Sequence, residues 1–117
     1  MTKQITKTAD SLDDGIKNMI DAMVEDYGVF STTALNNNIE MFNEYKNSFK
    51  ILNGRKFIKI INDNSVKAFI VKEDFKHFKK GDILKAAGYN APALNSARGN
   101  VLTGNYPIQW TGPLYLK

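Results

Sequence analysis

The stretch that decides the fold class covers residues 56–71 and reads KFIKIINDNSVKAFIV. Two runs rich in β-branched and aromatic residues, 56–61 and 66–71, flank a cluster of turn-forming residues at 62–65. This arrangement is typical of a β-hairpin. Lys59 interrupts an otherwise apolar strand, so its side chain either extends along an exposed face or points toward a partner.

Upstream of this hairpin, the sequence predicts an amphipathic helix that begins after Asp10 or Ser11 and ends at Gly28. Its apolar residues recur at spacings of three and four, as one buried face of a helix requires. That face consists of Leu12, Ile16, Met19, Ile20, Met23, Val24 and Tyr27.

A second helix is expected to begin at Ser31, Thr32 or Thr33 and to end before Asn53. Its apolar face has the same periodicity and consists of Leu35, Ile39, Phe42, Tyr45 and Phe49. Two helices with a short connection form a helical hairpin, whose apolar faces must be buried against another layer. The β-hairpin is the expected partner layer.

The rest of the chain is expected to form one short strand, at 82–86, and a long ordered loop. From Gly88 onward, Gly, Pro and Asn alternate with aromatic and aliphatic residues, a composition typical of ordered loops. The predicted fold class is therefore α+β, with an N-terminal helical hairpin packed on a small antiparallel β-sheet and a long ordered C-terminal loop segment. We expect a single domain (1–117) with a flexible start (1–9), an acidic helical part (10–50) and a basic strand-and-loop part (54–117).

The composition of the 117-residue chain excludes several kinds of chemistry. There is no cysteine, and His77 is the only histidine, which excludes thiolate catalysis and any site that needs two imidazoles. No glycine-rich phosphate loop is present. Adjacent carboxylates such as Asp13 and Asp14 point about 100° apart on a helix and do not converge on a metal or a substrate. We therefore expect a non-enzymatic protein with no metal and no cofactor.

Charge is distributed unevenly along the chain. Residues 1–45 carry three lysines and eight acidic residues, a net charge of −5, whereas residues 46–117 carry thirteen Lys and Arg and four acidic residues, a net charge of +9. Such asymmetry points to nucleic acid, DNA or RNA, or to another anionic partner. The alternative is that the acidic part packs beside the basic part and neutralises it.

Basic and aromatic residues of the second part are candidates for a nucleic-acid interface. Cations neutralise phosphates, and aromatic faces stack on unpaired bases. The alternative for the aromatic residues is the core of a small domain. The candidate interface residues are Lys56, Lys59, Lys67, Lys76, Lys79, Lys80, Arg98, Tyr89 and Trp110.

Arg98 stands between Ala97 and Gly99-Asn100, where Gly99 could adopt a positive φ. In a functional interpretation, the Arg98 guanidinium holds a phosphate or a carboxylate. In a structural interpretation, it donates hydrogen bonds to carbonyls of the long loop and fixes that loop to the sheet. The structural interpretation is favoured, because a long loop needs internal hydrogen bonds.

Several motifs in residues 54–116 resemble a group of small, uncharacterised proteins of tailed bacteriophages. They are GRKFIKI at 54–60, SVKAFI at 65–70, KGDILKAA at 80–87, APA at 91–93, ARGN at 97–100 and WTGPLY at 110–115. The resemblance implies a phage origin and carries no established activity.

Two functions therefore remain open. The first is a phage accessory protein that binds nucleic acid through the basic hairpin and loops. The second is a protein-binding module, an inhibitor of a host factor or a minor virion component, that uses the acidic helical face. No apolar run is long enough to span a membrane and no signal-peptide core is present, so we expect the host bacterial cytoplasm, or the virion, and no membrane.

Overall fold

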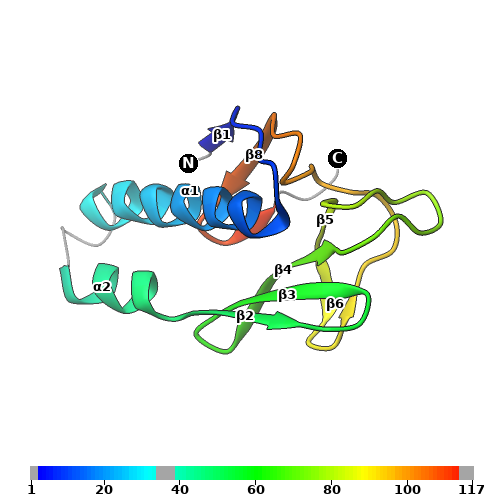
Figure 1. The fold of residues 1–117 in the computed structure, drawn as a ribbon. Helices are drawn as coiled ribbons and strands as arrows, with labels where there is room; N and C mark the ends of the chain where they lie inside the picture. Colours follow the sequence, from blue (N-terminus) through cyan, green and yellow to red (C-terminus); the bar gives the residue numbers. More distant parts are fainter. Residues whose placement is uncertain (1–2, 34–38, 114–117) are drawn as a thin grey trace.

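The computed structural model describes residues 3–33 and 39–113 (Figure 1). Helices and antiparallel sheets are combined in one mixed α+β arrangement, which confirms the predicted class. The elements are β1 (Lys3–Ile5), α1 (Leu12–Thr33), α2 (Ile39–Asn47), β2 (Phe49–Asn53), β3 (Phe57–Asn62), β4 (Ser65–Val71), β5 (Ile83–Leu84), β6 (Ala86–Gly88), β7 (Ala91–Pro92), β8 (Tyr106–Gln109) and β9 (Gly112–Pro113).

The predicted β-hairpin is present as β3 and β4. Asn62 pairs with Ser65, so the connection is a two-residue turn at Asp63 and Asn64. These two residues have φ values of 48° and 66°, the backbone that a tight hairpin turn of this length requires. Asp and Asn tolerate that backbone better than most residues, which explains why the turn forms here.

The hairpin is the centre of a four-stranded sheet with the order β2-β3-β4-β5. The third predicted strand forms, but only Ile83 and Leu84 pair with β4. Residues 49–53 form β2, so the prediction that the second helix continues nearly to Asn53 is wrong. Phe49 has the correct spacing for the helical face, but it pairs with Asn62 at the edge of the sheet instead.

Gly28 does not end the first helix, because α1 continues to Thr33. A Cβ at this position would lie 3.2 Å from the ring of Phe42, so the glycine allows α2 to approach α1 closely. Tyr27 contacts Phe42 and stacks on Tyr45, which joins the two helices through aromatic rings. The second helix does not begin at Ser31, Thr32 or Thr33, because these residues belong to α1 and α2 begins at Ile39. Leu35 lies outside the described residues.

The sheet separates two apolar clusters. On one face, α1 and the β1–β8 strand pair cover the side chains of Ile58, Ile60, Ala68 and Ile70 (Figure 1). On the other face, residues of the 75–78 and 86–97 segments cover a smaller cluster around Phe69, Val71, Phe78 and Leu84. Side chains alternate between the two faces of a strand, so Phe57 and Lys59 lie on the face opposite Ile58 and Ile60. Their cross-strand partners, Val71 and Phe69, lie on the same face. The candidate site is therefore on this second face, which carries Lys59.

Two further predictions about chain segments need correction. Within the expected flexible start (1–9), Lys3–Ile5 pair with β8 and Ile5 is buried. The C-terminal segment is ordered as expected but is not only loop, because it contributes β6, β7, β8 and β9. The β1–β8 pairing joins residues about a hundred positions apart, a contact that no local pattern predicts.

Asn100 connects the loops around β5. Its Nδ2 donates to the carbonyl of Lys80 and to Oδ1 of Asp82, both at 2.9 Å. Its Oδ1 accepts from the backbone N–H groups of Leu102 at 2.8 Å and Thr103 at 3.2 Å. Four hydrogen bonds from one side chain hold the segment after β4 against the segment before β8.

We expect Asn100→Ala to lower the free energy of unfolding by about 2–3 kcal/mol, since several backbone groups lose their partner at once. Urea denaturation followed by circular dichroism measures this loss. Asn95→Ala is the control, because the Asn95 side chain is exposed and accepts one hydrogen bond, from the next backbone N–H. Equal effects of the two substitutions would contradict the role of Asn100.

Candidate nucleic-acid interface

Lys59 lies on the outer face of β3 and holds the turn between β6 and β7. Its Nζ donates to Oδ1 of Asn90 at 3.2 Å and lies 4.3 Å from the centroid of the Tyr89 ring. The same Nζ is 5.9 Å from the ring of Phe69 on the neighbouring strand. Lys59 is half-buried by these contacts, yet Tyr89 remains 52% exposed. One ammonium group thus places an exposed aromatic ring above the sheet.

Beside this contact is a hollow of about 230 Å³, here named the Lys59 groove. Phe57 supplies its accessible aromatic surface, since Phe69 is only 3% exposed, and Arg55, Lys56 and Lys59 supply three cations. Among the described residues no carboxylate lines the groove, whose lining residues are Leu52, Asn53, Gly54, Arg55, Lys56, Phe57, Lys59, Phe69 and Asn90. The groove therefore has a positive potential over an apolar surface.

The loop between β2 and β3 presents two of these cations. The backbone N–H of Gly54 donates to the carbonyl of Phe57 at 2.9 Å and closes the loop. Arg55 and Lys56 are exposed at its tip, and the Lys56 Nζ lies 5.7 Å from the ring centroid of Phe75. Lys72 donates from Nζ to the carbonyl of Gly54 at 3.1 Å, which adds a fourth cation to this edge.

The lysines of the following loop lie close in sequence to Phe75 and are exposed. Lys76 has a φ of 53°, at the tip of the turn between Phe75 and Phe78. The Lys79 Nζ is 3.9 Å from a carboxylate oxygen of Asp74, and the backbone N–H of Lys80 donates to the same side chain at 2.7 Å. Asp74 therefore offsets part of the positive charge of this loop.

Lys67 and Trp110 lie at the other end of β3, away from the Lys59 groove. Both line a different hollow, which includes Asn62 at the far end of the strand. Burial lowers the pKa of the Lys67 ammonium, and the charge of Asp63 opposes that effect. The candidate residues therefore do not form one continuous surface.

The hydrogen bonds of Arg98 agree with its structural interpretation. Its Nε donates to the carbonyl of Ser96 at 3.2 Å, and its backbone N–H donates to the carbonyl of Ile83 at 2.8 Å. Gly99 has the expected positive φ, 153°, and its carbonyl accepts from the N–H of Ile83. The segment thus lies along β5. Burial lowers the pKa of Lys85, and the charges of Arg98 and Lys67 lower it further.

The comparisons with known proteins give one match. Residues 4–116 match the model of a family of unknown function, DUF7717. The chain belongs to this family. Neither the curated proteins nor the solved structures include a match. The DUF7717 match covers the two helices as well as the basic part, so both halves of the molecule belong to one family unit.

Sequence reasoning missed several residues of the Lys59 groove in this DUF7717 chain. Arg55, Asn53 and Asn90 line it but were not candidates. The proximity of Arg55 to the Asn53-Gly54 turn signal could have identified it, since turn tips expose their side chains. Asn90 gave no local signal, because its position depends on a contact with a strand thirty-one residues earlier.

No group of three or more His, Cys, Asp and Glu side chains converges among the described residues of this DUF7717 chain. The ring of His77 packs on Phe78 with centroids 4.0 Å apart, and its Nε2 lies 3.0 Å from the carbonyl oxygen of Asn95. In the described part of the chain, neither helix is both long and apolar enough to cross a bilayer.

Proposed function

We propose that this chain is a non-enzymatic accessory protein that binds single-stranded nucleic acid along the Lys59 groove. The observation that carries the proposal is that Arg55, Lys56 and Lys59 line one hollow together with Phe57, while no carboxylate among the described residues lines it. Phosphates require cations, and unpaired bases require aromatic or apolar surface. The groove offers both within one hollow.

Single strands suit this site better than duplexes. A duplex keeps its bases stacked and paired, so the exposed Tyr89 ring and the apolar surface of the groove would gain little from it. Lysine outnumbers arginine around the groove, which favours contact with the phosphate backbone over bidentate recognition of bases. We therefore expect modest affinity and little sequence preference.

The phage origin and the location of action are part of the same proposal. The resemblance of residues 54–116 to small proteins of tailed bacteriophages supports them, and the family match is silent on both. The chain would meet viral or host nucleic acid in the cytoplasm of an infected bacterium, or accompany the genome in the virion.

A labelled single-stranded oligonucleotide should bind at about 50 mM salt and bind much more weakly at about 200 mM. Three or four phosphate contacts correspond to a loss of roughly 20- to 50-fold over this range. Fluorescence anisotropy with single-stranded DNA, RNA and duplex DNA measures the affinities. Absence of binding at the lower salt concentration, or tighter binding of the duplex, would refute the proposal.

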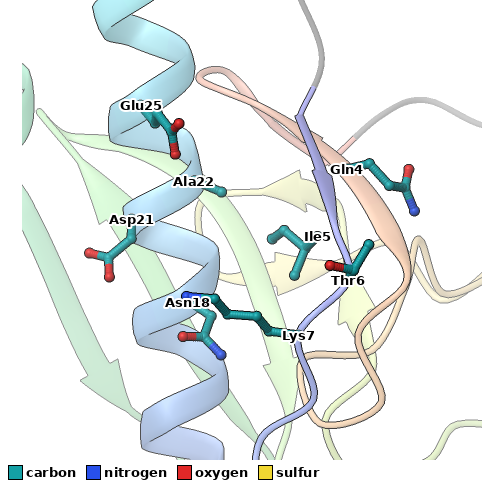
Figure 2. A pocket seen from close by; sticks show the side chains of 8 residues that line it. All are labelled: Gln4, Ile5, Thr6, Lys7, Asn18, Asp21, Ala22 and Glu25. Atoms are coloured by element: carbon teal, nitrogen blue, oxygen red, sulfur yellow. The ribbon is translucent and has the colours of Figure 1, made fainter.

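One observation favours the second candidate function, recognition of a protein by the acidic helical face. A hollow of about 180 Å³ lies between β1 and α1 (Figure 2). Ile5 and Ala22 point toward each other across it, and the Lys7 side chain extends toward Asn18 on the helix. Glu25 also lines it, and its carboxylate suits a basic side chain of a host or virion protein. The Asp21 carboxylate points away from β1 (Figure 2) and pairs with Lys17 at 3.1 Å.

Two charge-reversed variants distinguish these functions. Lys79→Glu/Lys80→Glu should weaken oligonucleotide binding about tenfold and reduce its salt dependence, because two exposed cations of the loop after β4 are lost. Asp13→Lys/Asp14→Lys, at the exposed start of α1, should leave binding unchanged or strengthen it. The same anisotropy titration measures both. If the acidic reversal abolishes binding and the lysine reversal has no effect, the helices rather than the basic loops form the interface.

A further inference from the structure

The proposed function does not use a second polar hollow, here named the Trp110 pocket. It has a volume of about 320 Å³ and lies where α1, α2, the β3–β4 turn and the β8–β9 turn meet. The side chains that give it chemical character are Tyr27, Tyr45, Trp110, Glu44, Asp63 and Lys67. Its size is that of a small-ligand site.

Three aromatic rings form one wall of this pocket, and Trp110 is the accessible one, because Tyr27 and Tyr45 are only 6% and 7% exposed. Tyr27 and Tyr45 are stacked, with centroids 4.2 Å apart and planes 3° from parallel. The Trp110 ring stands nearly perpendicular to both, at 83° and 80°, with centroid distances of 5.1 and 6.1 Å. Hydrogen bonds fix this wall: the Tyr45 hydroxyl donates to the backbone carbonyl of Trp110 at 2.6 Å, and the backbone N–H of Trp110 donates to Oδ2 of Asp26 at 2.8 Å.

The charges around these rings favour a cation. Asp63 and Lys67 interact electrostatically and offset each other, which leaves the exposed carboxylate of Glu44 at the opening. Asp26, only 1% exposed, lies behind the wall, and its Oδ1 has no hydrogen-bond partner among the described residues. Burial and the charge of Asp26 raise the pKa of the Tyr45 hydroxyl, so that ring stays a neutral phenol.

We infer that the Trp110 pocket binds a guanidinium group against the Trp110 ring of this wall, with Glu44 as the anionic partner. A guanidinium is planar, stacks on aromatic faces and donates two parallel hydrogen bonds to a carboxylate. A compact ammonium group could also pair with the Glu44 carboxylate, but it has no flat face to stack on the Trp110 ring. Lys67 opposes the ligand by like-charge repulsion, so its removal should strengthen binding.

Trp110 is the only tryptophan in the sequence, so its fluorescence reports on this pocket alone. Ethylguanidinium and a blocked Gly-Arg-Gly peptide are the probes for a free compound and for an arginine side chain of a protein. Their neutral isosteres, ethylurea and the citrulline peptide, are the controls. A saturable change of Trp110 fluorescence with either guanidinium probe and not with its isostere supports the site, and the tighter probe identifies the source.

Matched variants locate the binding. Glu44→Gln should weaken the guanidinium probe five- to tenfold, and Lys67→Met should strengthen it severalfold. Glu40→Gln, the same change one helical turn earlier and outside the pocket, should alter the affinity less than twofold. Circular dichroism confirms that each variant is folded. The inference is wrong if isosteres and guanidinium probes act alike, if neither acts, or if only inorganic phosphate changes the fluorescence.

Discussion

Gly99→Ala is expected to destabilise the protein by about 3–5 kcal/mol, enough to leave a marginally stable domain largely unfolded. A Cβ at this position would overlap the Cβ and Cγ of Tyr106, and the φ of 153° is one that residues with side chains rarely adopt. Tyr106 is 2% exposed within the main core, so its ring has no open space to move into. Thermal unfolding monitored by circular dichroism measures the loss.

Gly88→Ala is the matched control for this substitution. A Cβ at position 88 meets no atom within 4 Å, and Gly88 does not have a positive φ. We expect its unfolding temperature to stay within a few degrees of that of the unchanged protein. If the two alanine variants have similar unfolding temperatures, Gly99 does not pack closely against Tyr106 in the protein.

Arg55→Glu/Lys56→Glu should weaken binding of a single-stranded oligonucleotide roughly 100-fold at low salt. Each reversal removes a phosphate contact and adds a repulsive charge, a change of about 1.4 kcal/mol or tenfold. Both side chains are exposed at the tip of the β2–β3 loop, so the fold should be unaffected. Anisotropy titration at two salt concentrations measures the affinity and its salt dependence.

Lys7→Glu/Lys46→Glu provides the control with the same change in net charge. Both lysines are exposed and neither lines the Lys59 groove. We expect less than a fivefold loss, which reflects only the weaker general field of the protein. Equal losses in the two double variants would mean that binding depends on total charge and not on the groove.

The sequence predicted the β3–β4 hairpin well because its signals are local. β-Branched runs, a turn cluster and residues that tolerate positive φ all lie within sixteen positions. The ends of the helices were harder to predict. Gly28 has the character of a helix stop, but its role is to let Phe42 approach, a contact that belongs to the tertiary structure.

Pairing between segments that are distant in sequence explains the other differences between the predicted and the observed secondary structure. The spacing of Phe49 fits the apolar face of the second helix, yet residues 49–53 pair with the edge of β3 and form a strand. Lys3–Ile5 looked like a flexible start because their partner, β8, lies at the opposite end of the chain. The secondary-structure propensity of single residues cannot predict such pairings, because their free energy comes from burial and from a hydrogen-bond ladder between residues far apart in the sequence.

In the candidate site, too, the tertiary structure decides what the sequence alone does not. Lys56, Lys59 and Tyr89 come together in or beside one groove, whereas Lys67 and Trp110 lie at the other end of the sheet. A count of charges along the sequence predicts that the surface is positive, but it does not predict which cations lie together. Position on the sheet decides which cations act together.

The central claim, that the Lys59 groove binds single-stranded nucleic acid, is tested most directly by mapping amide chemical shifts by NMR during an oligonucleotide titration. We expect the largest shifts at residues 53–59, 69–72 and 89–90, which line or flank the groove. Shifts concentrated along α1 near Asp21 and Glu25, or no shifts at low salt, would contradict it.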